Sequence, residues 1–223
     1  MDLKGMVGRF QKLPNGTPVQ FRLTDLGNQA VDLVKPERGE LARANKRFCA
    51  VMGSGTFLAP VVAYPTTTLT MALYNPDTSG KAYYVDQAFE FLASGTPGAG
   101  GALLACVTDI AQARPTLSTG SNGGYAGTVI SSLSGRGSPG NTQAVFINAI
   151  TLTGSQPAWF VVQAEPAAGV GATIATHALV GDLKGGVLVP SGGMLGLTYL
   201  SGAGTAPLYG FGVIWNEMDA DVE

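Results

Sequence analysis

From Arg47 onward, the sequence is a succession of short apolar runs, each bounded by Gly, Pro, Asn or Ser. Such runs, rich in β-branched and aromatic residues and separated by turn-forming residues, are typical of antiparallel β-sandwiches and barrels. We therefore expect an all-β fold. The runs predicted to form strands are Arg47–Met52, Phe57–Tyr64, Thr68–Asn75, Ala82–Val85, Ala88–Ala93, Ala102–Thr108, Tyr125–Ser132, Thr142–Ile150, Trp159–Glu165, Thr173–Val180, Gly186–Val189, Met194–Leu200 and Leu208–Met218.

Charged residues divide the chain near Phe48. Nine of the 13 Lys and Arg residues lie in residues 1–50, where five acids leave a net charge of 9 − 5 = +4, whereas residues 51–223 carry 4 − 10 = −6. We expect a docking arm at 1–47, a sandwich body at 48–218 and an acidic tail at 219–223. Three windows of the body have no charged residue, and such surfaces usually face something other than water. These windows are Phe48–Pro76, Gly137–Gln163 and Gly185–Asn216.

The predicted arm has two segments with a local structural preference. Pro18–Leu23 alternates apolar and polar residues with the period of a strand. Pro36–Lys46 has Pro at its start, acids early and bases late, which predicts one short helix. We expect the arm to dock to a partner protein by strand addition and by salt bridges from clustered bases. The predicted docking residues are Phe21, Arg38, Arg43, Lys46 and Arg47.

Other partners and locations are disfavoured by the same residues. Five acids are interleaved with the bases of the arm, so we do not expect it to bind nucleic acid. No segment has the roughly 18 consecutive apolar residues that span a bilayer, so no membrane partner is expected. An early acid, Asp2, and the lack of an apolar h-region argue against a secretory signal and predict cytoplasmic synthesis. Cys49 and Cys106 lie in apolar runs and are predicted to be buried free thiols.

None of the residue clusters in the sequence meets the requirements of a catalytic or cofactor site. His177 is the single histidine, and no Gly-x-Ser-x-Gly elbow accompanies it, so we predict a hydrogen-bonded strand histidine. The glycines of Phe89–Leu104 lack the Gly-Lys-Ser/Thr ending of a phosphate-binding loop. We therefore expect no enzyme activity and no cofactor. Two alternatives stay open: a glycosidase pair such as Glu90 with Glu165, and binding of calcium or a basic partner by the acidic tail.

The segment Val187–Glu217 has a Pro-Ser-Gly-Gly turn at 190–193, followed by two runs rich in Gly and aromatic residues. It resembles the ending of jelly-roll structural proteins of tailed bacteriophages, in which such a turn introduces two closing antiparallel strands. The resemblance implies a jelly-roll-like antiparallel β-sandwich with an extended N-terminal arm that contains one short helix. It also implies a virion component, such as a capsid-decoration (cement), head-spike or tail-adaptor protein. Such proteins are often trimers, and their N-termini anchor them to major capsid or tail proteins.

Aromatic residues and glycines of these closing runs are the candidate assembly residues. Tyr199, Tyr209, Phe211 and Trp215 are expected to fill either the sandwich core or a subunit seam. Alternation places Tyr209, Phe211, Val213 and Trp215 on one face, so these four should share one environment. Five glycines indicate close backbone approach or bulges, which are tolerated where neighbouring chains pack. They are Gly196, Gly202, Gly204, Gly210 and Gly212.

A second function class stays open on the sequence alone. Two loops rich in Gly and Ser, at 118–124 and 134–140, bracket one predicted strand, and loop tips at the end of a sandwich are suitable contact surfaces. A carbohydrate- or receptor-binding sandwich would use these loops together with Tyr125 or Trp159.

Overall fold

The protein divides into two units, Met1–Glu37 and Arg38–Glu223. A computed structural model describes residues 22–23, 29–30, 37–53, 57–98, 100–108, 112, 129–133, 142–152, 157–165, 177–202 and 204–220. In the first unit, β1 (Arg22–Leu23) pairs antiparallel with β2 (Gln29–Ala30). The helix α1 (Glu37–Arg43) begins at the boundary and confirms the short helix predicted for this part of the chain.

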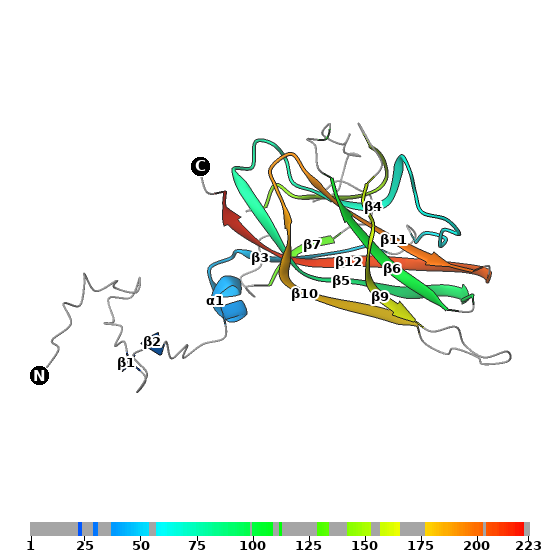
Figure 1. The fold of residues 1–223 in the computed structure, drawn as a ribbon, viewed down its shortest axis with the longest axis horizontal. Coiled ribbons are helices and arrows are strands. Elements are labelled where there is room, and N and C mark those ends of the chain that lie inside the picture. The colour runs from blue at the N-terminus through cyan, green and yellow to red at the C-terminus, as the bar shows by residue number, and fades with distance from the viewer. Residues whose placement is uncertain are drawn as a thin grey trace, which may run out of the picture. The chain divides into compact units, whose positions relative to one another are not determined.

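The second unit is an antiparallel β-sandwich of two five-stranded sheets (Figure 1). We call the sheet with the order β10-β5-β12-β3-β7 the front sheet, and the sheet with the order β8-β4-β11-β6-β9 the back sheet. The front strands are β3 (Arg47–Val51), β5 (Lys81–Thr96), β7 (Val129–Ser132), β10 (Ala178–Val189) and β12 (Thr205–Asp219). The back strands are β4 (Thr68–Tyr74), β6 (Gly101–Val107), β8 (Val145–Thr151), β9 (Phe160–Glu165) and β11 (Met194–Ser201).

The pairing of these strands is that of a jelly roll. The first strand of the sandwich, β3, pairs with the last, β12, and moving inward along the chain β4 pairs with β11, β5 with β10 and β6 with β9. All four pairs are antiparallel, so two halves of the chain are wound together as one long hairpin folded over two sheets. The strands β7 and β8, which lie between the halves in sequence, extend the two sheets beside β3 and β4. The jelly-roll expectation is confirmed.

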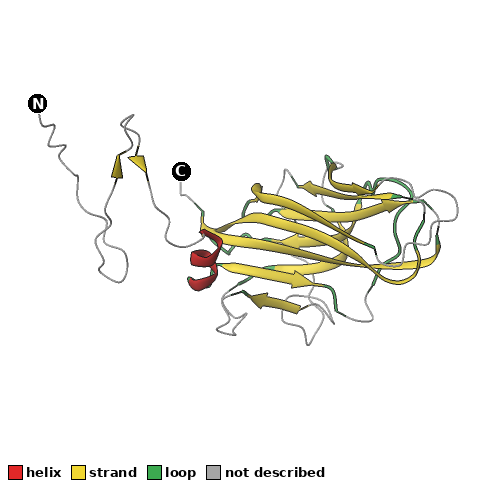
Figure 2. Cartoon of the chain, turned by 90° about the horizontal axis from the view of Figure 1, so that it is seen from below, coloured by secondary structure: helices red, strands yellow, loops and turns green. Residues whose placement is uncertain are grey.

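Two of the longest strands include runs that the sequence analysis predicts as separate strands. β5 contains both Ala82–Val85 and Ala88–Ala93, and its pairing with β12 shifts register there. β10 contains Gly186–Val189, and its register against β5 shifts between Asp182 and Val187. Bulges of this kind let a long strand keep its side chains on the correct face. Figure 2 shows long strands running along the sandwich, with the helix at one end.

The prediction of a strand at Phe57–Tyr64 is wrong. Only Leu58 and Val61 make bridges, Leu58 to Tyr209 of β12 and Val61 to Leu200 of β11. The segment therefore passes from the front sheet to the back sheet instead of adding to either one. Pro60 explains the interruption, because it has no N–H to donate to a ladder.

Apolar side chains form two separate clusters. The main core lies between the sheets, and its largest fully buried members include Trp215, Tyr83, Tyr199 and Phe146. A second cluster includes Tyr74, Cys106 and Met194 and is packed against Ile150, Leu152 and Trp159. The back sheet thus contributes to two apolar clusters.

The uncharged window Gly185–Asn216 has a different explanation from the one its composition suggests. It contains β11 and most of β12, which are the central strands of the two sheets, and most of their residues are buried. Charge is absent there because a central strand packs on both faces within one chain. Parts of the window are nevertheless exposed, among them Leu188 at the end of β10 and Leu208 in β12, which are 46% and 37% exposed.

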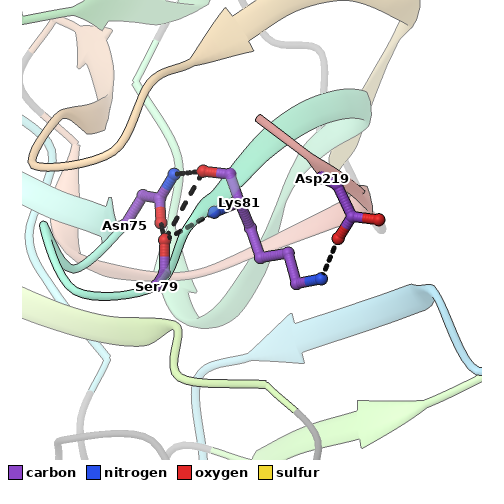
Figure 3. Close-up of polar contacts among 4 residues, drawn as sticks. All are labelled: Asn75, Ser79, Lys81 and Asp219. Carbon is purple, nitrogen blue, oxygen red and sulfur yellow. Dashed lines mark hydrogen bonds and ion pairs between the residues drawn. The ribbon is translucent and has the colours of Figure 1, made fainter. Parts of the chain in front are cut away.

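A pair of interlocked turns closes one end of the sandwich. The buried side chain of Asn75 donates hydrogen bonds from Nδ2 to the carbonyl oxygens of Lys81 and Val189, at 2.8 and 3.0 Å. Its Oδ1 accepts a hydrogen bond from the Ser79 hydroxyl, as Figure 3 shows. One side chain thereby joins the turn between β4 and β5 to the strand that leads into the next turn, at Ser191 and Gly192.

Candidate functional site

Three titratable side chains, Glu90, His177 and Glu165, form a connected group in the sandwich. Glu90 lies on the inner face of β5, His177 immediately precedes β10, and Glu165 is the last residue of β9. Because β9 and β10 are edge strands of opposite sheets, the group bridges the sandwich at its open side. The side chains of His177 and Glu90 are 1% and 0% exposed, whereas that of Glu165 is 25% exposed.

The imidazole of His177 lies between the two carboxyl groups. Its Nε2 is 2.8 Å from Oε1 of Glu90, and its Nδ1 is 2.6 Å from Oε2 of Glu165. The rings of Tyr199 and Tyr209 pack against the imidazole, with centroid distances of 5.2 and 5.6 Å. The backbone carbonyl of His177 accepts a hydrogen bond from the N–H of Leu92, so both its main chain and its side chain are fixed to β5.

Burial dominates the electrostatics of Glu90. It raises the pKa of this carboxyl to about 8, a hydrogen bond from the N–H of Leu179 acts in the opposite direction, and the charge of Glu165 raises it further. The second oxygen, Oε2, is buried and accepts no hydrogen bond from the described residues. A buried oxygen without a donor favours the neutral carboxylic acid over the anion.

This arrangement is suited to holding and transferring protons. Glu165 reaches solvent and Glu90 does not, and the two ring nitrogens of His177 lie 2.6 Å from Glu165 and 2.8 Å from Glu90, although Nε2 makes no hydrogen bond with the described residues as the side chains stand. The pair Glu90 and Glu165 was one candidate for a glycosidase centre. The imidazole occupies the space between the two carboxyl groups, and no sugar fits there.

The predicted cluster of arm bases belongs to the sandwich unit and is partly engaged there. Arg47 is buried at the start of β3, where its guanidinium forms an ion pair with Asp86 and a hydrogen bond of 3.3 Å to Asn216. Arg38 in α1 forms ion pairs of 2.8 Å with Asp86 and 3.3 Å with Asp182. The buried carboxylate of Asp86 therefore holds both guanidinium groups. Arg47 is a fixed part of the sandwich rather than a side chain presented for docking.

The other predicted docking residues lie in different environments. Arg43 is exposed in the last turn of α1, and Lys46 is half-buried between α1 and β3. Phe21 lies outside the described residues. In the acidic tail, Asp219 ends β12 and forms an ion pair with Lys81, whose hydrogen bond lowers the Asp219 pKa. Residues 221–223 lie outside the described part of the chain.

The four candidate seam residues are core residues. Tyr199, Tyr209, Phe211 and Trp215 are at most 1% exposed and belong to the main core, which decides between the two expectations. The prediction that Tyr209, Phe211, Val213 and Trp215 share one environment is confirmed, because all four are buried in the main core.

Four of the five candidate glycines are closely approached by atoms of their own chain. A Cβ at Gly210 or Gly212 would lie 2.3 or 2.2 Å from the ring of Phe91 or Phe89, respectively. Gly196 and Gly204 are similarly crowded, whereas Gly202 has open space around it.

The two possible glycan contacts have different outcomes. Trp159 is half-buried, packs against the second apolar cluster, and donates from its indole N–H to the carbonyl oxygen of Pro65 at 3.0 Å. Tyr125 and the loops at 118–124 and 134–140 lie outside the described residues.

Both cysteines are free, Cys106 buried and Cys49 half-buried, and burial raises the pKa of Cys106 to about 12.

The outer face of the front sheet carries apolar side chains that the sequence analysis did not single out. Tyr84, Val180 and Leu188 are 37%, 56% and 46% exposed, and Phe89 and Phe91 lie half-buried beside them. The cross-strand pairs are Leu188 with Tyr84 and Val180 with Phe89. We call these five residues the front apolar face.

The alternating residues of β5 are the sequence signal from which both the Glu90 group and the front apolar face could have been predicted. Phe89-Glu90-Phe91 alternates, so one side of the strand has two phenylalanines and the other has a carboxylate. Hydrophobic burial alone places the phenylalanines inside. The structure has the opposite arrangement, because the two rings cover Gly210 and Gly212 on the outer face while Glu90 meets His177 inside.

These features define a jelly-roll β-sandwich protein with a buried Glu-His-Glu group and an apolar outer face. Comparisons with family models, with curated proteins and with solved structures found no match to this chain. Within the described residues, no group of His, Cys, Asp and Glu is arranged to hold a metal ion. No helix in that part of the chain has the length and apolar character needed to cross a membrane.

Proposed function

We propose that this protein is a non-enzymatic structural component that assembles as a homo-oligomer and is attached to a larger particle by its N-terminal unit. The virion of a tailed bacteriophage is the proposed setting, on the basis of the resemblance of its closing strands. A cement, head-spike or tail-adaptor role fits a sandwich with a short N-terminal unit. Because a fold alone does not imply a function, the surface of the sandwich has to carry the argument.

The observation that carries the proposal is the front apolar face. Three of its members, Tyr84, Val180 and Leu188, are more than one-third exposed on two adjacent strands. Two cross-strand apolar pairs, Val180 with Phe89 and Leu188 with Tyr84, lie on either side of Asp182 and Gln87, and exposed apolar groups gathered on one sheet face favour an interaction surface. On the back sheet, the second apolar cluster is packed against Ile150, Leu152 and Trp159 of the same chain, and Phe160 and Val161 of the edge strand β9 are 36% and 57% exposed.

A second copy of the chain is the proposed occupant of this face. Asp182 lies on β10 between Val180 and Leu188 and pairs with Arg38, and the two side chains are 43% and 46% exposed. Each therefore retains exposed surface that can contact the opposite charge on another copy. A face with an apolar area and both signs of charge complements itself, as an interface between identical chains requires.

Attachment is assigned to the first unit because the chain divides between Glu37 and Arg38. The ion pairs of Arg38 and Arg47 belong to the sandwich, so an informative deletion removes residues 1–36 and leaves both arginines in place. We expect the shortened chain to keep the oligomeric state of the full chain and to be lost from purified phage particles. Retention at full occupancy would refute attachment by this unit, and a monomeric full chain would refute assembly.

A further inference from the structure

We propose that Glu90, His177 and Glu165 form a proton-dependent latch, which holds the edge strands β9 and β10 to β5 while Glu90 carries a proton and loosens when that proton is lost. The latch does not depend on the oligomeric state or on the proposed attachment. It follows from where the three residues lie and from the number of hydrogen-bond donors between them.

The three residues connect elements that are otherwise joined mainly at their strand ladders. Glu165 ends β9 of the back sheet, and His177 precedes β10 of the front sheet. Oε1 of Glu90 accepts a hydrogen bond of 3.2 Å from the N–H of Leu179, the second residue of β10. Glu90 is thus in contact with the start of β10 through both the Leu179 backbone and the His177 side chain.

Counting donors shows why a proton on Glu90 matters. A neutral imidazole has one N–H, yet His177 faces a carboxyl oxygen at each ring nitrogen. When Nδ1–H donates to Glu165, the Nε2 lone pair faces Oε1 of Glu90 at 2.8 Å. Protonated Glu90 supplies the missing donor, whereas ionised Glu90 places a buried negative charge against a lone pair.

Among the described groups around Glu90, an imidazolium form of His177 is the one that could replace that proton with a positive charge, and it would keep the same single proton between Glu90 and His177. The titratable side chains that face it are His177, Glu165, Tyr199 and Tyr209. Glu165 is a second acid, and burial raises the pKa of both tyrosines. Among the described residues, no Lys or Arg forms an ion pair with Glu90.

The direction of the pH effect follows from the two states of Glu90. In the closed latch its pKa is raised to about 8, whereas in an opened, solvated state it returns to the ordinary value of 4.5. Between these values the closed state holds one proton more than the open state, so the latch is tightest at low pH and weakens as pH rises. The opening constant is expected to rise about tenfold per pH unit from pH 5.5 to 8 and then to level off.

The test uses the full chain and two measurements. The first follows the Glu90 side-chain carboxyl by ¹³C NMR in the unmodified protein, with a midpoint expected near 8. The second follows amide hydrogen exchange at Leu179 and Leu92, corrected for intrinsic pH dependence, in the unmodified protein and in Glu90→Gln. Glutamine donates and accepts at this position without ionising, so the tenfold-per-unit rise of opening should disappear in the variant.

Glu217→Gln is the matched control, because Glu217 is also a buried carboxyl with a raised pKa but contacts Thr142 and Trp215 instead. This variant should keep the pH dependence of Leu179 and Leu92. A Glu90 midpoint near 4.5, or equal pH dependence in the unmodified protein and Glu90→Gln, would overturn the latch. Loss of the dependence in Glu217→Gln would do the same, because the effect would then be global.

Discussion

At the scale of single residues, polar side chains hold the loops of this sandwich at defined positions. Asn75 is fully buried. Its amide group makes three hydrogen bonds, which join the turn between β4 and β5 to the end of β10. An amide can donate twice and accept at the same time, and no apolar residue of similar size does so. This position therefore requires an amide side chain, and an apolar side chain of similar volume cannot replace it.

Asn75→Ala should lower the free energy of unfolding by about 2–4 kcal/mol, because buried carbonyl oxygens lose their donor. Thr78→Ala is the control from the same turn, since the Thr78 hydroxyl makes only an exposed contact of 3.5 Å to Gln143. It should change stability by less than about 0.5 kcal/mol. Urea unfolding of both variants checks the difference, and similar losses would contradict the role assigned to Asn75.

Glycines two positions apart provide a second residue-scale comparison. A Cβ at Gly204 would lie 2.3 Å from the carbonyl oxygen of Thr96 and 2.8 Å from backbone atoms of Pro97 and Gly98. A Cβ at Gly202 would meet no atom within 4 Å. Gly204→Ala should therefore destabilise the protein by about 1–3 kcal/mol, because backbone has to move. Gly202→Ala should stay within about 0.5 kcal/mol of the unmodified protein in thermal unfolding.

At the scale of elements, α1 is fixed to the sandwich by the carboxylate of Asp86. This carboxylate is buried, and it pairs with Arg38 from the helix and with Arg47 from β3. Arg47 is buried as well, so removing its partner leaves a buried charge without compensation. The side chain of Asp182, which shares Arg38, is 43% exposed.

Asp86→Ala is expected to cost about 3–5 kcal/mol of stability, because Arg47 is left unpaired in the interior. Asp182→Ala, which breaks only a half-exposed pair, should cost less than about 1 kcal/mol. Chemical denaturation at low salt measures both. Equal effects would show that the burial of the Asp86 pairs has no energetic consequence.

The element scale also shows where prediction from sequence succeeds and fails. Turn residues and strand-type runs locate most strands to within a few residues, and the acids and bases of Pro36–Lys46 locate α1. Periodicity cannot decide which face of β5 is inside, because Phe89 and Phe91 gain contact with glycines of β12, which is distant in sequence. For the same reason the Glu90, His177 and Glu165 group has no local signature: its members come from three strands that only the jelly-roll winding brings together.

At the scale of the whole molecule, several acidic side chains are buried, whereas apolar side chains are exposed on the front sheet. The acids Asp86, Glu90 and Glu217 are buried, whereas Tyr84 and Val180 are exposed on the front sheet. The latch and the front apolar face share β10, so loosening the start of β10 is expected to weaken assembly as pH rises.

Sedimentation equilibrium of the full chain, unmodified and as Val180→Lys, tests the central claim most directly. Lysine at position 180 places a charge in the front apolar face, and Val62→Lys is the control, because Val62 is 79% exposed but lies outside that face. We predict an oligomeric mass for the unmodified chain and for Val62→Lys, and a monomeric mass for Val180→Lys with an unchanged circular dichroism spectrum. An oligomer that persists in Val180→Lys would contradict the assigned face, and a monomeric unmodified chain would contradict assembly itself.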